Sequence, residues 1–154
     1  WVDSNQVLSQ QLAEANLSTT WPEEKEDWTR RQTLLSFQTV AKLIASRKVR
    51  KVERDFFYVE VRGFDTHNDI RPVMEELFDN LNFALEAFVA ELKAQGIFEA
   101  TTLVTSSDFG RTLTSNGKGT DHGWAGNYVV LGGAVKGGKV FNSFPSSLLE
   151  GNNQ

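Results

Sequence analysis

Aspartate and histidine lie close together at two places in this chain, each a short distance after a glycine. Its two histidines, His67 and His122, each lie within two residues of an aspartate, Asp65 and Asp121. A third aspartate, Asp108, follows an apolar run and precedes Phe-Gly. Carboxylate oxygens and imidazole nitrogens are common ligands of divalent cations. These five side chains on three loops are therefore candidate metal ligands.

A simpler interpretation remains open at this stage. Each histidine can also serve only its own loop, by hydrogen bonding to its neighbours. The chain has no cysteine, so a thiolate site is excluded and the redox compartment is not indicated. Because three Asp or Asp-His groups follow strand-like runs or glycines, the metal interpretation and the loop interpretation carry about equal weight.

Arg111 follows Asp108 by three residues and offers two kinds of chemistry. Its guanidinium can bind two oxygens of a phosphate or sulfate, or it can form a salt bridge with Asp108. No serine or threonine nearby stands in a nucleophile motif such as Gly-x-Ser-x-Gly. The glycine-rich stretch 132–139 lacks the spacing of a phosphate-binding loop and is interpreted as a turn. We expect Trp124 to pack beside His122.

The pattern of apolar residues predicts the elements that must position these side chains. Helices are predicted at roughly 3–15, 24–46 and 72–95, and strands at 55–62, 101–106 and 127–131. Pro22 with two glutamates opens the second helix, and Gly96 closes the third. The strand-helix-strand stretch 55–106 predicts a right-handed crossover between parallel strands. In that arrangement the loops carrying Asp65 and Asp108 lie at one edge of the sheet.

Composition limits the class of protein and of partner. The chain has 154 residues, of which 40% are hydrophobic, and it carries a net charge of -4. These values are typical of a globular domain and give no electrostatic reason to expect nucleic acid as a partner. No apolar run has the length of a membrane span, so membrane insertion is not expected. We interpret residues 1–22 as a polar linker or peripheral helix and 23–154 as the domain proper.

Four motifs together resemble the family called Domain of Unknown Function 1501, which is sulfatase-like and belongs to the alkaline phosphatase superfamily. They are Gly-Phe-Asp-Thr-His (63–67), Ser-Asp-Phe-Gly-Arg-Thr (107–112), Thr-Asp-His-Gly-Trp (120–124) and the valine- and glycine-rich run 130–140. The resemblance covers roughly residues 30–145, with the motifs in the expected order. It implies an α/β/α sandwich around a mostly parallel sheet, of which this chain is the C-terminal part.

The resemblance also implies metal-dependent hydrolysis of phosphate or sulfate esters. Asp65 and His67 correspond to one pair of metal ligands and Asp108 to the acid of the second pair. His122 corresponds to a late histidine ligand, with Asp121 beside it as a further ligand or as a partner that supports the ligands. The metal is zinc, calcium, magnesium or manganese, and Arg111 corresponds to a group that neutralises the anionic substrate. Phe109 stands where phosphatases of the superfamily carry a histidine, so one nitrogen ligand is missing.

In superfamily enzymes the nucleophile and an early metal-binding aspartate come from an N-terminal half, and no motif in this chain corresponds to that half. We therefore expect the nucleophile to lie outside this chain, on a missing N-terminal portion of the same polypeptide or on a partner chain. The resemblance further suggests an extracytoplasmic location, periplasmic or secreted. Two hypotheses follow: part of a metallohydrolase, or a non-catalytic structural or interaction subunit of a larger assembly that keeps the fold.

Overall fold

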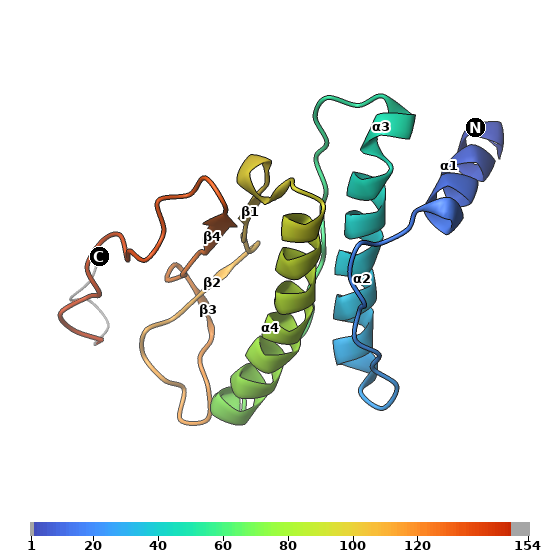
Figure 1. Cartoon of the computed structure of the whole chain (residues 1–154). Coiled ribbons are helices and arrows are strands. Elements are labelled where there is room, and N and C mark those ends of the chain that lie inside the picture. The colour runs from blue at the N-terminus through green and yellow to red at the C-terminus, as the bar shows by residue number, and fades with distance from the viewer. Residues whose placement is uncertain (1, 149–154) are drawn as a thin grey trace. The chain divides into compact units, whose positions relative to one another are not determined.

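The computed structural model describes residues 2–148, which form a mixed α/β structure (Figure 1). Four α-helices, one short 3-10 helix and four short strands follow one another along these residues. In chain order they are α1 (Val2–Glu14), α2 (Trp28–Ala45), α3 (Arg47–Arg50), α4 (Ile70–Ala94), the 3-10 turn Phe98–Ala100, β1 (Thr102–Val104), β2 (Gly110–Arg111), β3 (His122–Gly123) and β4 (Val130–Gly132). The three long helices confirm the helices expected from the sequence.

The chain divides into two compact units. The first contains the chain up to Val61 together with Phe78–Phe98, and the second contains Arg62–Leu77 with the chain from Glu99 onward. Helix α4 contributes to both units, because the boundary falls between Leu77 and Phe78. All strands belong to the second unit, as do the three loops that carry the candidate ligands.

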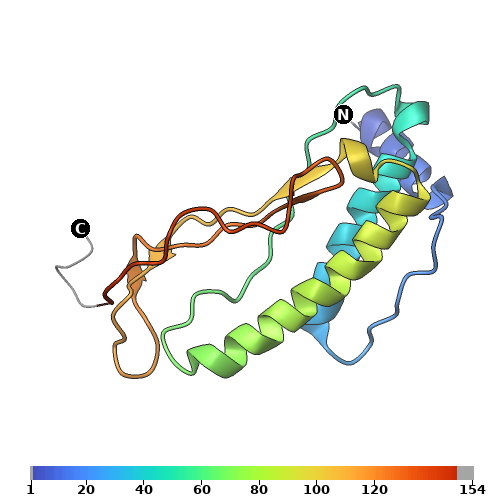
Figure 2. The ribbon, with the colours of Figure 1, turned by 60° about the vertical axis from the view of Figure 1, so that its left-hand side comes forward.

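The core of the first unit lies between α2 and α4, which run alongside each other (Figures 1 and 2). Phe37 from α2 and Phe88 from α4 meet with ring centroids 5.2 Å apart and an interplanar angle of 53°. Small residues allow the helices this approach, since Ala41 and Ala84 are fully buried. Burial of these apolar stripes, which repeat every three or four residues, is what stabilises the helix pair.

The ends of these helices follow capping chemistry. Helix α2 begins at Trp28, four residues later than the sequence pattern predicts, because Asp27 caps it by accepting a hydrogen bond from the amide of Arg30 at 2.9 Å. Before that cap, Glu24 accepts hydrogen bonds from the amides of residues 26 and 27, which form a turn rather than a helix. At the C-terminal end of α4, Gly96 has a φ of 66° and its amide donates a hydrogen bond to the carbonyl of Lys93, as expected for a C′ glycine.

A buried carboxylate fastens the N-terminal linker to α4. Glu91 is fully buried, and its two oxygens accept hydrogen bonds from the amides of Ser18 and Thr19 at 2.8 Å each. The hydroxyl of Thr19 and the side-chain amide Nε2 of Gln95 donate two more, at 2.6 and 2.8 Å. With four donors, this acidic residue is satisfied in the core of the first unit.

The second unit contains two small antiparallel sheets. Strands β1 and β4 pair in the register Thr102 with Gly132, Leu103 with Leu131 and Val104 with Val130. Strands β2 and β3 pair Gly110 with Gly123 and Arg111 with His122. The glycine-rich stretch after β4 is a turn, as expected, since the amide of Val135 bonds to the carbonyl of Gly132.

The strand expected over 55–62 is not present in the described structure, and the segment is drawn as coil between α3 and α4 (Figure 1). It keeps the alternation of a strand, because Phe57 and Val59 are half-buried whereas Phe56 and Tyr58 are 94% and 80% exposed. β-propensity reports how well side chains fit a pleated surface, and it does not supply the neighbouring strand that completes a ladder. The expected parallel crossover is therefore not among the described strand pairs, which are both antiparallel.

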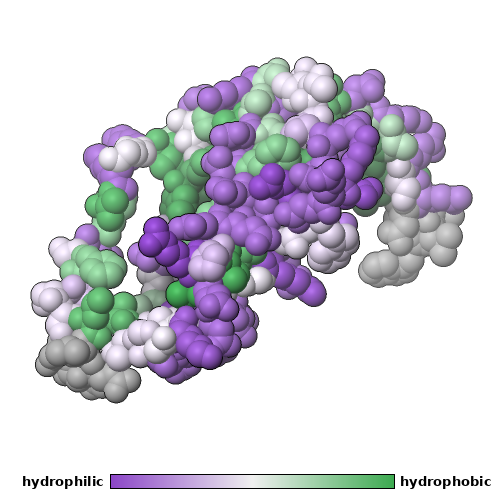
Figure 3. All heavy atoms as spheres, turned by 90° about the horizontal axis from the view of Figure 1, so that it is seen from below, coloured by the Kyte–Doolittle hydropathy of each residue, from purple (hydrophilic) through white to green (hydrophobic). Residues whose placement is uncertain are grey.

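Apolar side chains also reach the surface of the second unit. Nine large hydrophobic residues there are about half exposed or more, and apolar areas are visible among polar ones in Figure 3. They are Val104, Trp124, Tyr128, Val129, Val130, Val140, Phe141, Phe144 and Leu148. Among the described helices, none combines the length and the apolar character needed to cross a membrane.

Candidate metal centre

Asp65 and His67 lie on the loop that leads into α4. The amide of Thr66 bonds to the carbonyl of Phe64 at 3.0 Å, which forms a tight turn and leaves the side chains of residues 65 and 67 exposed. Gly63 precedes this turn with a φ of 106°, and a Cβ there would lie 2.9 Å from a methyl carbon of Leu77. A glycine is therefore required both by the backbone conformation and by the close packing of the loop on α4.

His122 and Arg111 are brought together by the β2–β3 hairpin. They are direct partners in the register, and the amide of Thr112 bonds to the carbonyl of Asp121 at 2.9 Å next to them. Both flanking glycines are needed for this pairing, because a Cβ on Gly110 would lie 2.6 Å from the carbonyl oxygen of Ala125. The hairpin thus places an imidazole and a guanidinium side by side.

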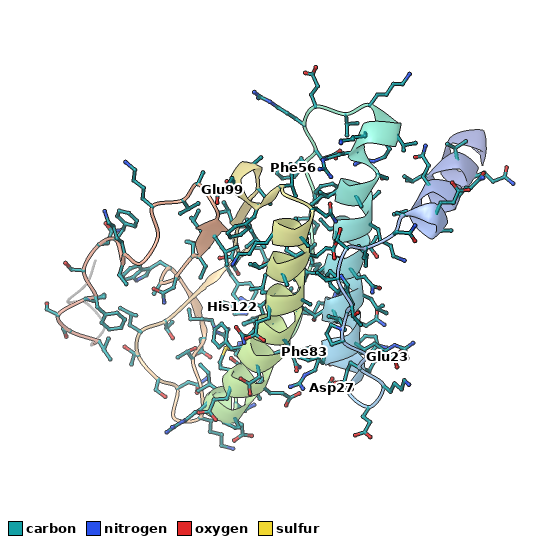
Figure 4. All side chains as sticks on the ribbon, viewed as in Figure 1. Glu23, Asp27, Phe56, Phe83, Glu99 and His122 are labelled. Carbon is teal, nitrogen blue, oxygen red and sulfur yellow. The ribbon has the colours of Figure 1, made fainter. Side chains whose placement is uncertain are left out.

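The hairpin and the loop before α4 meet at one oxygen atom, Oδ1 of Asp65. His122 Nε2 lies 2.8 Å from it, His67 Nδ1 lies 3.2 Å from it, and Arg111 donates to it from a distance of 3.2 Å. Arg111 also donates to the carbonyl of Thr66. One potential ligand atom from each of Asp65, His67 and His122 lies within 4.8 Å of the others, so the three can hold one cation (His122 is labelled in Figure 4).

The electrostatics of Asp65 favour its charged form. The hydrogen bond from His122 is the largest effect and lowers the pKa of this carboxyl group. Burial opposes it, and the electrostatic effects of His122, His67 and Arg111 lower the pKa further. A carboxylate that is ionised at neutral pH is ready to bind a cation without first losing a proton. The side chain is more than half exposed, so solvent screens these interactions and they contribute little to the stability of the fold.

The imidazole of His122 contacts two other rings. Phe109 stacks on it with centroids 3.9 Å apart and an interplanar angle of 7°, and His67 lies on it at 5.2 Å and 38°. Trp124, which was expected to pack beside His122, is 66% exposed. The ring that stacks on His122 is that of Phe109.

The loop between β2 and β3 is held against the segment that carries His67. Asn116 donates to the carboxylate of Asp121 at 2.9 Å and to the carbonyl of His67 at 3.4 Å. Its own side-chain oxygen accepts hydrogen bonds from the amides of residues 118 and 119. Gly119 lies so near the backbone of His67 that a Cβ would be 2.6 Å from its carbonyl oxygen. The loop therefore holds the backbone of His67 in place.

The five predicted ligands are not all in one place. The structure brings together Asp65, His67 and His122, whereas the carboxylate of Asp121 is hydrogen-bonded to Asn116 beside them. Asp108 is exposed on a turn in which the hydroxyl of Ser107 donates to the carbonyl of Phe109. Arg111 pairs with Asp65 rather than with Asp108, and its alternative role of binding a phosphate or sulfate stays a prediction.

Sequence reasoning missed Phe109 and Asn116, which contact the ligand residues without being ligands themselves. The spacing of Phe109 two residues before Arg111 was a usable signal, because alternate residues of a strand share a face. Three polar atoms among these loops are buried without a hydrogen-bond partner in the described structure, namely Thr66 Oγ1, Arg111 Nε and Thr120 Oγ1. Such atoms in a native site call for a ligand or water.

Most of the chain matches a known protein family. The model of the family described as "Protein of unknown function (DUF1501)" matches residues 4–147. The chain belongs to the DUF1501 family. The match covers all three loops of the DUF1501 site, including the Asp65, His67 and His122 cluster. A search of curated proteins and a search of solved structures each found no significant match to this DUF1501 chain.

Proposed function

We propose that this DUF1501 chain is part of a metal-dependent hydrolase of phosphate or sulfate esters, related to the alkaline phosphatase superfamily. The observation that carries the proposal is the convergence of Asp65, His67 and His122 from segments more than fifty residues apart. The motif order that resembles the superfamily supports it. The proposal includes a larger, parallel-sheet fold of the superfamily type, a nucleophile outside these residues and an extracytoplasmic location.

The donor set fits a transition metal better than a hard cation. Two imidazole nitrogens and one carboxylate oxygen suit zinc best, while calcium, magnesium and, to a lesser degree, manganese are bound mainly by oxygen ligands. The two donors beside Asp65, His122 Nε2 and His67 Nδ1, are ring nitrogens that can bind a metal in the neutral imidazole. Three protein ligands leave positions open for substrate, as is typical of catalytic sites.

Each residue then has a distinct task. Asp65, His67 and His122 would hold the cation, which when bound polarises an ester oxygen and stabilises charge on it. Arg111, whose side chain is about one-fifth exposed, keeps N–H groups beyond those used on Asp65 and Thr66 and can bind an anionic oxygen with them. Thr66 and Thr120 bring buried hydroxyls that still lack a partner.

A second candidate function is favoured by one observation. Arg111 already forms a salt bridge with Asp65, and His67 and His122 contact the same oxygen, so the charge of Asp65 is balanced without a cation. A cluster of this kind can fasten the hairpin to the loop before α4 in a non-catalytic structural or interaction subunit. The two functions differ in whether the protein binds metal.

The test is metal binding by the purified protein, measured by elemental analysis and by calorimetric titration with zinc and with manganese. We expect about one ion per chain for the wild type at this site. Asp65→Asn and His122→Ala should each lower the affinity at least about a hundredfold, because each removes a ligand. Asp79→Asn, which changes an exposed carboxylate on α4, is the matched control and should bind like wild type.

Two results would decide against the metallohydrolase. If the wild type binds neither ion, the charge cluster is structural and the second function holds. If the wild type binds an ion but Asp65→Asn and His122→Ala bind it equally well, the ion lies elsewhere. Asp108→Asn, measured in the same series, shows whether Asp108 contributes a ligand to a second site.

A further inference from the structure

The side chain of Phe109 has the closest and most parallel ring contact that the structure describes at the metal centre. Its ring lies 3.9 Å from the imidazole of His122 at an angle of 7°, whereas His67 lies farther away and is tilted. The guanidinium carbon of Arg111 lies 5.7 Å from the centre of the same ring. One aromatic side chain therefore contacts two of the three groups that surround the carboxylate of Asp65.

The stacking is built into the hairpin. Phe109 directly precedes Gly110, and Gly110 pairs with Gly123, the residue after His122. A Cβ on Gly123 would lie 2.7 Å from the amide nitrogen of Thr112, so the two backbones approach more closely than side chains would allow. The hydroxyl of Ser107 fixes the backbone of Phe109 by donating to its carbonyl at 2.8 Å. These features hold the Phe109 ring against His122.

His122 needs such a support because its side chain is half exposed. A single contact between Nε2 and Asp65 Oδ1 fixes one atom of the imidazole and leaves the ring free to turn about it. A flat aromatic neighbour restricts the plane of the ring as well, since tilting the imidazole would lose the stacking contact. Groups that orient a ligand in this way change metal affinity without touching the metal.

We propose that Phe109 is a positioning residue of the metal centre, which holds the His122 ring so that Nε2 faces Asp65 and the cation. The proposal rests on the metal-dependent function proposed above. It gives a role to the residue that replaces the histidine expected from the superfamily pattern: the position supplies a stacking surface in place of a ligand. A side chain that keeps an aromatic ring should preserve this role, and an aliphatic one should not.

The variants Phe109→Leu and Phe109→Tyr test the proposal, with Phe144→Leu as the matched control because Phe144 is an exposed phenylalanine of the same unit. The first measurement is zinc affinity by calorimetry at one fixed pH. We expect Phe109→Leu to bind zinc at least about tenfold more weakly than wild type. Phe109→Tyr should stay within about twofold of wild type, because the stacking face is retained. Phe144→Leu should not differ from wild type.

The second measurement is the long-range nitrogen–proton NMR spectrum of the imidazoles, which is simple because the chain has only two histidines. His67→Asn assigns the signals. In the metal-free wild type we expect His122 to show a single tautomer with the proton on Nε2, since that nitrogen faces a carboxylate. Phe109→Leu should show a mixture of tautomers, and Phe109→Tyr should restore the single one.

Each outcome bears on one proposal or the other. Equal zinc affinity and an unchanged His122 tautomer in Phe109→Leu would overturn the role of Phe109 and leave the metal site standing. No zinc binding by wild type would overturn the proposed function, and the NMR comparison would then decide alone whether Phe109 orients His122. If Phe109→Leu does not fold, as judged by circular dichroism, Phe109→Met is used under the same two criteria.

Discussion

Asp65 and Glu91 both have lowered pKa values, for different physical reasons. Asp65 is exposed, and its pKa is lowered first by the hydrogen bond from His122. Glu91 is fully buried, and burial alone would raise its pKa, yet hydrogen bonds from Ser18, Thr19 and Gln95 outweigh burial and lower the pKa to about 2. The carboxylate of Asp65 is therefore accessible to a ligand, whereas the oxygens of Glu91 already accept four hydrogen bonds within the fold.

We predict that Glu91→Gln destabilises the protein by about 1–3 kcal/mol at pH 7, since the amide cannot accept the four hydrogen bonds and leaves donors unsatisfied. Because the folded-state pKa of about 2 lies below the ordinary value of 4.5, the stabilisation by Glu91 is complete above about pH 4.5 and decreases as the pH falls toward 2. The difference between wild type and Glu91→Gln should decrease over the same range.

Urea unfolding followed by circular dichroism at pH 7 and pH 3 measures this difference. Glu86→Gln is the matched control, because Glu86 is an exposed glutamate on the same helix that accepts one hydrogen bond from Asn82. A free-energy difference between wild type and Glu91→Gln that is the same at both pH values would show that the charge of Glu91 does not contribute.

At the scale of elements, the loop between β2 and β3 determines whether the side chain of His67 can reach Asp65 and His122. Gly119 packs against the backbone of His67, and its Cβ position is 2.6 Å from the His67 carbonyl oxygen and 2.7 Å from its carbonyl carbon. No flexible side chain lies there to move aside. Any larger residue must therefore displace the loop or the segment that carries His67.

We predict that Gly119→Ala lowers the free energy of unfolding by about 1–3 kcal/mol through overpacking, and that it weakens zinc binding as well. Gly137→Ala is the control, since the nearest atom to a Cβ there is 4.0 Å away. Denaturant unfolding and zinc titration of both variants make the comparison. Should Gly119→Ala bind zinc as tightly as Gly137→Ala does, the contact with His67 would have no role in the site.

The helices were easier to predict from the sequence than the pairing of the strands. Helical stripes and cap residues are local, so α1, α2 and α4 were predicted to within a few residues, and Gly96 was correctly expected to end α4. Strand patterns are local too, but strand pairing is not. The segment 101–106 was correctly expected to contain a strand, whereas its partner β4 runs antiparallel and the segment 55–62 forms no described strand. The apolar pattern predicts which residues of a strand share one face, but it does not identify the strand that pairs with it.

The candidate site was predictable to a similar degree. The types and spacing of Asp65, His67 and His122 marked them in advance, and the structure places them together. The partner of Arg111 was not predictable, because it depends on the packing of the hairpin against a loop forty-six residues earlier. The support from Phe109 and Asn116 was missed for the same reason. Residue chemistry is present in the sequence, while the contacts between distant loops depend on the fold.

At the scale of the whole molecule, the exposed apolar residues are the feature that the two proposed functions must account for. Val140, Phe141 and Phe144 are 95%, 78% and 73% exposed within one five-residue stretch of the second unit. Single exposed apolar residues are common, but several together usually mark a surface that binds something. A larger superfamily-type fold would cover such residues, and so would a partner in an assembly.

We predict that this stretch binds apolar probes in the isolated chain. The double variant Val140→Ser, Phe141→Ser should reduce the fluorescence of bound anilinonaphthalene sulfonate by about half, because two of the most exposed apolar side chains are removed. Its circular dichroism and urea midpoint should equal those of wild type, since neither side chain is buried. Lys139→Ser, a polar change in the same segment, is the control and should leave the fluorescence unchanged.

Fluorescence in the double variant as strong as in wild type would show that the probe binds elsewhere, and a lowered urea midpoint would show that these residues already support the second unit. Reduced fluorescence with an unchanged midpoint would identify the stretch as a surface that contributes nothing to the stability of the isolated chain, which is what both proposed functions require.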